Sequence, residues 1–215
     1  MIVTDNDNYW NEYYKSKHEE IIKETLFADY ILQNWVKNRK RLIEFGCGNG
    51  RDAIFFCKNG LEVVAVDSSA AAINELKSRG HKCLFLEENF VNSANIYHMK
   101  YDICYSRFTI HAISLSDEIK LLENAYNSLE EKGLICIEVR SIKDSLFGKG
   151  KKIGRDEYIY NNHYRRFIRM NEILERLIKI GFHIRYAEEN TDFAPFGEEN
   201  PMIIRIVAEK ENEDV

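Results

Sequence analysis

The stretch of sequence with the clearest chemistry is LIEFGCGNG (residues 42–50), in which an apolar run with one acid leads into three alternating glycines. Glycine lets the backbone of such a loop approach a ligand closely or adopt a positive φ. A phosphate-binding P-loop is excluded, because neither its lysine nor its hydroxyl residue follows Gly50. The dinucleotide-binding spacing G-x-G-x-x-G is also absent, and Glu44 would repel a pyrophosphate. The acid predicts instead a cationic group on the ligand.

A second carboxylate, Asp67, follows the glycine loop at the end of the next predicted strand. Asp67 ends the β-branched run LEVVAVD (residues 61–67), 19 residues after Gly48. A carboxylate in that place can accept hydrogen bonds from the hydroxyl groups of a ribose. A ligand with an ammonium group near one carboxylate, a ribose on another and no phosphate between them is S-adenosylmethionine. The two loops therefore predict a site for this cofactor.

A further group of candidate residues lies in SRFTIHAIS (106–114), in EVRS (138–141) and at the end of the long segment 141–166. Arginine, tyrosine and histidine together are typical of sites that hold a phosphate or a carboxylate. Each residue also has a structural interpretation: a half-buried or helix-capping histidine, a solvated arginine, or tyrosines (158, 160 and 164) that pack the segment. The candidates are Ser106, Arg107, His111, Glu138, Arg140, His163, Tyr164, Arg165 and Arg166.

Strands and helices alternate along most of the chain, and this order positions the candidate residues. Such alternation predicts a Rossmann-like, doubly wound α/β fold with a mostly parallel seven-stranded sheet and an antiparallel C-terminal strand. Ligands bind at the carboxyl ends of such strands, so the loops after residues 45, 67, 86, 106 and 140 are the ones expected to bind them. The pattern predicts strands at 41–45, 61–67, 82–86, 101–106, 134–140, 182–189 and 201–209, helices at 51–59, 69–79, 117–133 and 170–180, and an irregular segment at 141–164.

Length and composition favour one soluble domain over residues 1–215. The chain is 45% hydrophobic and 30% charged, and no apolar run approaches the length of a membrane-spanning helix. The five cysteines are scattered without a C-x-x-C pair, which argues against disulfides and a zinc site and favours a reducing cytoplasm. We therefore expect a cytoplasmic protein with no metal and no membrane partner.

Charge is distributed unevenly along the sequence. Residues 140–170 hold nine Lys or Arg and three Asp or Glu, a local charge of +6 in a chain of net charge −5, so the remainder carries −11. A basic segment on an acidic protein predicts an anionic partner at one place rather than general binding of polyanions. Long segments inside compact domains are often lids, and we expect 141–166 to be a substrate lid.

Three motifs, LIEFGCGNGRD, VVAVDSS and YDICYSRF, resemble those of class I S-adenosylmethionine-dependent methyltransferases over roughly residues 40–140. The resemblance implies that Glu44 and the glycine loop hold the methionine part of the cofactor and that Asp67 holds the ribose. For the adenine, Asn89 with the backbone of Phe90, or Glu88, remain alternatives. The expected cofactor-binding residues are Glu44, Gly46, Gly48, Asn49, Gly50, Arg51, Asp67, Ser68, Asn89, Phe90 and Ser106.

A second, less specific resemblance indicates the class of the methyl acceptor. The chain lacks the N/D-P-P-Y/F motif of DNA amino-methyltransferases and a metal-binding carboxylate pattern. Instead NGRDAIFF, SRFTIHAI, EVRSIKDSLFGKG and HYRRFI resemble small methyltransferases of bacterial capsule and lipopolysaccharide biosynthesis. This implies O-methylation of a small anionic precursor of a surface polysaccharide, bearing a phosphate or phosphoramidate and possibly linked to a nucleotide. The alternatives are a sugar-hydroxyl methyltransferase, an RNA methyltransferase, and a cofactor-binding protein without activity.

The two acceptor classes require different chemistry. An ionised acceptor needs positive charge to hold it, whereas a hydroxyl acceptor needs a general base. The expected catalytic residues are Arg107, His111, Arg140, His163, Tyr164 and Arg165, with a histidine as the base if the acceptor is a hydroxyl. The resemblance also implies that an N-terminal helical segment, residues 1–39, covers the cofactor through Tyr9, Trp10, Tyr13 and Tyr14. The alternative is that these aromatic residues form an apolar helix face that packs on the sheet.

Overall fold

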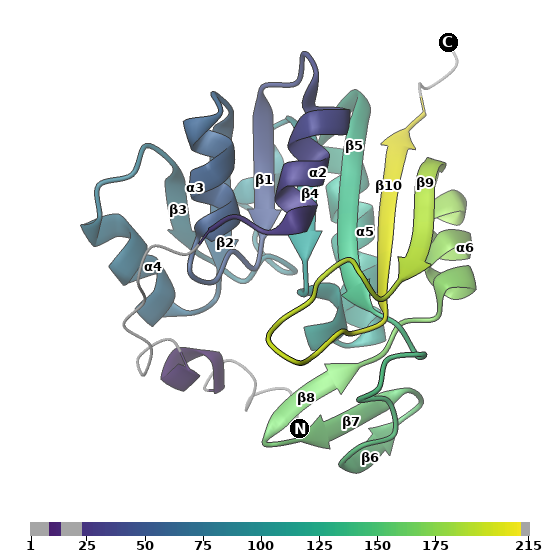
Figure 1. Cartoon of the computed structure of the whole chain (residues 1–215). Coiled ribbons are helices and arrows are strands. Elements are labelled where there is room, and N and C mark those ends of the chain that lie inside the picture. Colours follow the sequence, from purple (N-terminus) through teal and green to yellow (C-terminus); the bar gives the residue numbers. More distant parts are fainter. Residues whose placement is uncertain (1–8, 14–22, 212–215) are drawn as a thin grey trace.

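A seven-stranded sheet with helices on both faces forms the body of the protein, in a computed structural model that describes residues 9–13 and 23–211 (Figure 1). Residues 9–13 are helical. The strands are β1 Arg41–Phe45, β2 Glu62–Asp67, β3 Leu84–Glu87, β4 Tyr101–Arg107, β5 Leu129–Arg140, β6 Lys151–Gly154, β7 Glu157–Tyr160, β8 His163–Arg166, β9 Phe182–Asn190 and β10 Ile203–Lys210. The helices are α2 Leu26–Ile31, the π-helix η1 Leu32–Val36, α3 Arg51–Lys58, α4 Ala70–Ser78, the 3₁₀ turns η2 Ile96–His98 and η3 Ile110–Ala112, α5 Leu115–Ser128 and α6 Met170–Ile180.

The strand order of the large sheet is β3-β2-β1-β4-β5-β10-β9. Strands β1 to β5 are parallel, and β10 is antiparallel to both of its neighbours, β5 and β9. The predicted fold is therefore confirmed, including the antiparallel pair formed by the last two strands. The strand order reverses between β1 and β4, so the loops that follow these two strands border one crevice.

Alternating side chains along the strands build two hydrophobic cores, one on each face of the sheet. In β1, Leu42 packs on the face covered by α2, α3 and α4, while Ile43 packs on the face covered by α5 and α6. Both side chains are fully buried. Two-sided burial of this kind explains why the parallel strands are continuous apolar runs in the sequence.

The prediction of a helix over 117–133 is wrong at its C-terminal end. Helix α5 ends at Ser128, whose hydroxyl donates to the carbonyl oxygen of Ala125 (3.0 Å). Leu129 is already extended and pairs with Tyr101 of β4. Glutamate and lysine at 130–132 favour helix locally, but pairing with the neighbouring strand overrides that preference.

The prediction of an irregular segment at 141–164 is also wrong, because β6, β7 and β8 form a second, three-stranded antiparallel sheet. Asn161 and Asn162 have φ values of 51° and 55° and connect β7 to β8 in a two-residue turn. Asparagine tolerates this conformation, and paired positive φ values are typical of tight hairpins. The Asn-Asn pair between alternating residues was the sequence signal for this hairpin.

The second sheet lies at the edge of the large sheet where the parallel strands end. Figure 1 shows β6, β7 and β8, together with the helical residues 9–13, on the side to which the arrowheads of β1 and β4 point. Strand β8 contacts η3, the turn that follows β4. The second sheet therefore adjoins the edge at which a ligand of this fold is expected.

Candidate functional site

The glycine loop after β1 adopts a conformation that other residues would strain. Gly46, Gly48 and Gly50 have φ values of 71°, 53° and 73°. A Cβ atom on Gly46 would lie 2.5 Å from the hydroxyl oxygen of Thr109, so there is also no space for a side chain. The amides of Gly46 and Cys47 donate to the carbonyl oxygen of Val66 (2.8 and 3.0 Å) and fix the loop to β2.

Asp67, at the end of β2, connects the glycine loop to the loop that it begins. One of its carboxylate oxygens accepts from the amide of Gly48 (2.8 Å), and the other accepts from the amide of Ser69 (2.9 Å). A carboxylate oxygen can accept more than one hydrogen bond. Asp67 thus joins the two loops through both of its carboxylate oxygens, and its role in binding a ribose stays a prediction.

Two polar atoms beside the glycine loop are buried without a partner among the described residues. They are Oε2 of Glu44 and the hydroxyl oxygen of Ser106, on the neighbouring strands β1 and β4. Burial raises the pKa of Glu44 well above its usual range, and nearby Asp52 and Asp67 raise it further while Arg107 opposes them. Buried polar groups are rarely unpaired. The ammonium group of S-adenosylmethionine would supply the missing donor, so the residues present fit this cofactor.

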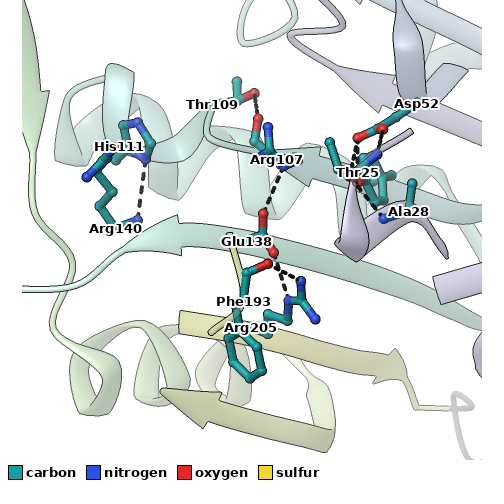
Figure 2. A network of polar contacts seen from close by, with 11 residues as sticks. Thr25, Ala28, Asp52, Arg107, Thr109, His111, Glu138, Arg140, Phe193 and Arg205 are labelled. Carbon is teal, nitrogen blue, oxygen red and sulfur yellow. Dashed lines mark hydrogen bonds and ion pairs between the residues drawn. The ribbon is translucent and has the colours of Figure 1, made fainter. Parts of the chain in front are cut away.

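Asp52, in the first turn of α3, connects this helix to the segment before β1. Its carboxylate accepts from the amide and the hydroxyl of Thr25 (2.9 and 2.8 Å) and from the hydroxyl of Tyr105 (2.9 Å) (Figure 2). Thr25 is also the N-cap of α2. The helix before β1 is thereby fixed to the helix that follows the glycine loop.

The loop after β3 carries the predicted adenine-binding residues. The side-chain oxygen of Asn89 accepts from the amides of Val91 and Asn92 (3.0 and 3.2 Å), so it shapes the loop. Glu88 accepts from the side chain of Asn95 (2.9 Å), and its own amide donates to the carbonyl oxygen of Asp67 (3.1 Å). The loop thus adjoins the predicted ribose site, and the structure does not select between the two adenine candidates.

A pocket of about 300 Å³ lies beside the start of α3 and the carboxyl ends of β4 and β5. Of the predicted acceptor residues it includes Arg107 and Arg140, and it also includes Arg51 from the predicted cofactor set. His111, His163, Tyr164 and Arg165 are not in its wall. The lining residues are Glu24, Thr25, Leu26, Arg51, Arg107, Phe108, Arg140, Phe193, Ala194, Pro195, Phe196, Glu199 and Pro201.

A buried carboxylate orients Arg107 in this pocket. Glu138 is fully buried and accepts from Nε of Arg107 (2.8 Å) and from Nε of Arg205 (2.7 Å) (Figure 2). The three residues lie directly opposite one another on β4, β5 and β10. Burial raises the pKa of Glu138, while the two arginines oppose that rise. The ion pair thus fixes the orientation of the Arg107 guanidinium in the pocket wall.

Arg140 is held by acidic partners and by an aromatic ring. Its guanidinium contacts Asp144 (3.0 Å) and Glu199 (3.7 Å). The guanidinium groups of Arg107 and Arg140 lie 4.2 and 5.6 Å from the ring centre of Phe108. Two cations therefore share one aromatic ring in the pocket wall.

Both predicted histidines are buried and poor bases. Nδ1 of His111 accepts from the amide of Arg140 (3.4 Å), and burial followed by the charge of Arg140 lowers its pKa well below 6.5. Burial and then Arg165 and Arg140 lower the pKa of His163 to about 3. Nε2 of His163 has no hydrogen-bond partner in the described parts of the chain. At neutral pH both rings are uncharged.

Residues 9–13 contact both sides of the crevice. The ring of His163 stacks on Tyr9 (4.7 Å between centres) and meets the edge of Trp10 (4.9 Å). The side-chain oxygen of Asn11 accepts from the hydroxyl of Ser69 (2.9 Å), which follows β2. Tyr14 lies outside the described residues. The helical segment therefore joins β8 to the loop that begins with Asp67.

The remaining residues of the second sheet differ in role. Arg166 is buried and pairs with Glu118 of α5, so it is structural. Burial and then the charge of Arg140 lower the pKa of Arg165. Burial and then Glu157 raise the pKa of Tyr164, so its hydroxyl stays protonated and can donate.

Much of the positive charge in 140–170 is compensated by acids. Arg155 pairs with Glu172 (2.6 Å), Arg169 with Asp156 (2.7 Å), and Lys143 with Glu189. Together with the pairs of Arg140 and Arg166, five of the nine basic residues have an acidic partner. The partners at 118, 172 and 189 lie outside the basic segment, so the sequence could not show them.

The loop 191–202 between β9 and β10 was not predicted to bind a ligand, but it contributes six residues to the pocket wall. Its aromatic residues, Phe193 and Phe196 in the stretch FAPF, were the available signal. No group of three potential metal-ligating residues occurs in residues 9–13 and 23–211, and no helix there is long and apolar enough to cross a membrane.

Comparisons with known proteins agree with the geometry. A family model described as a methyltransferase domain matches residues 15–186. A Burkholderia thailandensis 1,6-didemethyltoxoflavin-N1-methyltransferase, solved with S-adenosylhomocysteine, is 17% identical over 97% of this chain and 88% of its own (TM-score 0.74). The Streptomyces caelestis methyltransferase CcbJ is 15% identical over 99% and 100% (0.70), and the glycopeptide N-methyltransferase MtfA is 15% identical over 88% and 95% (0.67). Among curated proteins the comparison found no match.

Proposed function

The chain belongs to the methyltransferase-domain family and is an S-adenosylmethionine-dependent methyltransferase, and we propose that its acceptor is a small anion methylated on oxygen. The observation that carries this proposal is the set of three arginines, Arg51, Arg107 and Arg140, in one pocket beside the glycine loop. Arginine holds phosphate and carboxylate groups through planar, charged hydrogen bonds.

Residues at the ends of β1, β2 and β4 would hold the cofactor, which supplies a methyl group activated on a positively charged sulfur. Glu44 would accept from its ammonium group, and Asp67 from its ribose hydroxyls. The fixed conformation of Gly46, Gly48 and Gly50 would let the backbone approach it closely. Of the remaining predicted contacts, Asn49, Ser68, Asn89 and Phe90 lie in the loops after β1, β2 and β3, and Ser106 lies in β4.

The histidines favour a site that orients an anion over one that removes a proton. A base with a pKa of about 3, such as His163, is a weak proton acceptor at neutral pH. An ionised oxygen needs no base, because it already has its attacking lone pair. Arg107 and Arg140 would orient the anion, while His111, behind the backbone of Arg140, would position that arginine. Arg165, His163 and Tyr164 would extend the cationic side of the site under the cover.

The sequence resemblance suggests that the acceptor is a precursor of a bacterial surface polysaccharide that bears a phosphate or phosphoramidate. Nucleotide-linked precursors belong to the same class. Two of the enzymes with similar structures methylate other molecules, both on nitrogen: one methylates 1,6-didemethyltoxoflavin and the other a glycopeptide. Support for an anionic oxygen acceptor in this chain therefore comes from its own arginines. Acidic partners compensate much of the charge of 140–170, which argues against an RNA methyltransferase because RNA binding needs a continuous basic surface.

The proposed enzyme is a single cytoplasmic domain over residues 1–215, with its site covered from two directions. Residues 9–13, within the proposed cover at 1–39, contact His163 of β8, within the proposed lid at 141–166. A cover of this kind would exclude water from the crevice and hold the acceptor in line with the methyl group.

An acceptor panel tests the proposal. The full-length protein would be incubated with S-adenosylmethionine and with sugar phosphates, nucleotide sugars, neutral sugars or amines, and the release of S-adenosylhomocysteine measured. We expect turnover with phosphorylated compounds and its loss in Arg140→Ala, while Arg79→Ala, on the surface of α4, serves as the matched control. Turnover restricted to neutral sugars or amines would refute the anionic acceptor and leave the methyltransferase assignment intact.

A further inference from the structure

The pocket has a second wall with a chemistry that differs from that of its arginines. The loop 191–202 contributes no cation, and its one acid in the wall, Glu199, contacts Arg140 (3.7 Å). The other lining residues of the loop are uncharged: Phe193, Ala194, Pro195, Phe196 and Pro201. The cations of the pocket, Arg51, Arg107 and Arg140, come from α3, β4 and β5. An anionic group therefore belongs on the strand side of the pocket, and an uncharged group belongs on the loop side.

Arg205 fixes the start of this loop, and it also pairs with Glu138, the carboxylate that holds Arg107. A terminal nitrogen of Arg205 donates to the carbonyl oxygen of Phe193 (2.8 Å), and its guanidinium lies 4.2 Å from the centre of the Phe193 ring. Arg205 also donates to Glu138 (2.7 Å). Figure 2 shows Phe193, Arg205, Glu138 and Arg107 as one connected network. The position of the loop is thus coupled to that of the anion-binding side.

The tip of the loop is a hydrogen-bonded turn that exposes an aromatic side chain to solvent. The amide and carbonyl of Phe196 bond to the carbonyl and amide of Glu199 (2.9 Å each), and Gly197 between them has a φ of 57°. The side chain of Asn200 donates to Asp192 (3.2 Å) across the loop. Phe196 is nevertheless 78% exposed. Its place in the pocket wall, on a structured turn, makes this ring available to a ligand in the pocket.

The facing part of the pocket also presents a flat surface. Phe108 has a φ of 57°, which is uncommon for a large side chain, and its ring carries the guanidinium groups of Arg107 and Arg140. Aromatic rings and guanidinium planes both prefer to pack against flat, unsaturated groups. The two walls therefore suit a planar ring better than a saturated one.

We propose that the loop 191–202 forms a subsite for a planar, uncharged ring that the acceptor carries next to its anionic group. This inference deepens the proposed function and rests on it, since it places the ring beside the anion held by Arg107 and Arg140. Phe196 and Phe193 are the residues that determine this specificity, and Arg205 is a positioning residue that acts through Phe193. The acceptor class is accordingly an aryl or heteroaryl anion, in which a base-bearing nucleotide is included.

Three phosphate esters of equal charge test the subsite: phenyl, cyclohexyl and methyl phosphate. They would be titrated by NMR against the full-length protein with S-adenosylhomocysteine, together with phenol as a probe without an anion. We expect phenyl phosphate to bind at least tenfold more tightly than methyl phosphate and about threefold more tightly than cyclohexyl phosphate. Phenol should bind weakly and shift the resonances of the loop.

Variants at the exposed ring make the test specific. Phe196→Leu, which keeps an apolar side chain, should abolish the preference for phenyl over cyclohexyl, and Phe196→Ala should remove most of the advantage over methyl phosphate. Methyl phosphate itself should bind equally to all three proteins. Ile178→Ala, at an apolar position of α6 that is 59% exposed, is the matched control.

The outcomes separate the subsite from the anion site. The subsite is overturned if phenyl phosphate has no advantage in the wild type, or if its advantage survives in Phe196→Ala. Binding of phenol that does not depend on Phe196 also overturns it, even where no phosphate binds. Equal affinity of methyl phosphate for wild type and Arg140→Ala instead refutes the proposed anionic acceptor.

Discussion

Replacing Glu44 by glutamine separates the stability of the protein from its affinity for the cofactor. Oε2 of Glu44 is buried without a partner among the described residues, and the carboxylates of Asp52 and Asp67 are close enough to raise its pKa. Glutamine keeps the shape of the side chain and removes the charge. The ligand-free protein should therefore gain stability, while the ligand-bound protein should lose the attraction between the carboxylate and the ammonium group.

The magnitudes follow from the burial of the group. An unpaired buried polar group costs about 1–3 kcal/mol, so we expect the free energy of unfolding of ligand-free Glu44→Gln to rise by about 1 kcal/mol. For a chain of this size, that corresponds to a rise in Tm of about 2–4 °C. Affinity for S-adenosylhomocysteine should fall by about 1–3 kcal/mol, which is about 5- to 150-fold in Kd.

The pH dependence of stability gives an independent check. Burial raises the folded-state pKa of Glu44 above its unfolded value, so the folded protein binds the proton more tightly. Its contribution is favourable below the unfolded pKa of about 4.3 and is lost as the pH rises through the folded pKa. Wild type should accordingly lose more stability than Glu44→Gln as the pH rises over this window.

Calorimetry and thermal unfolding, each with and without S-adenosylhomocysteine, measure both effects. Glu62→Gln is the matched control, since Glu62 is exposed at the start of the neighbouring strand β2, and it should change neither quantity. An unchanged affinity in Glu44→Gln, or a lower Tm of its ligand-free form, would show that the carboxylate of Glu44 does not bind the cationic group of the cofactor.

Three further predictions concern the ribose, the lid and the histidines. Asp67→Ala should weaken binding of S-adenosylhomocysteine by about 1–3 kcal/mol in calorimetric titration; undiminished affinity would remove the ribose assignment. Hydrogen exchange over 141–166 should slow when cofactor and an anionic acceptor are both bound, and equal protection without them would exclude a closing lid. His111→Asn and His163→Asn should each lower turnover less than about tenfold and leave the pH–rate profile unchanged, because both pKa values are lowered. A loss of about 10²–10⁴-fold with a changed acidic limb would indicate a general base instead.

The central sheet and the cofactor loop could be predicted because their signals are local. Each buried strand is a continuous apolar run, and each of Gly46, Gly48 and Gly50 sits where only glycine adopts the backbone conformation without strain. Asp67 could be found for the same reason, since it ends its strand. A residue at the end of a strand can be located from the sequence, because the apolar run that precedes it marks where the strand ends.

The proposed acceptor pocket could be predicted only in part, because it is assembled from distant segments. Arg107 and Arg140 were expected there, but the network that orients Arg107 depends on Arg205, which is 98 residues later in the chain. The loop 191–202 looked like an ordinary connection between two strands. The basic segment 140–170 looked more cationic than it is, since several of its acidic partners lie elsewhere.

The kinetics of Arg140→Ala with a phosphorylated acceptor test the central claim most directly. The transfer of a labelled methyl group from S-adenosylmethionine would be followed in wild type, in Arg140→Ala and in the surface control Arg79→Ala. We expect Arg140→Ala to lose about 10- to 100-fold in kcat/KM, chiefly through KM of the acceptor, with an unchanged KM for S-adenosylmethionine. An unchanged KM of the acceptor in Arg140→Ala would contradict the claim that this pocket binds the anion to be methylated.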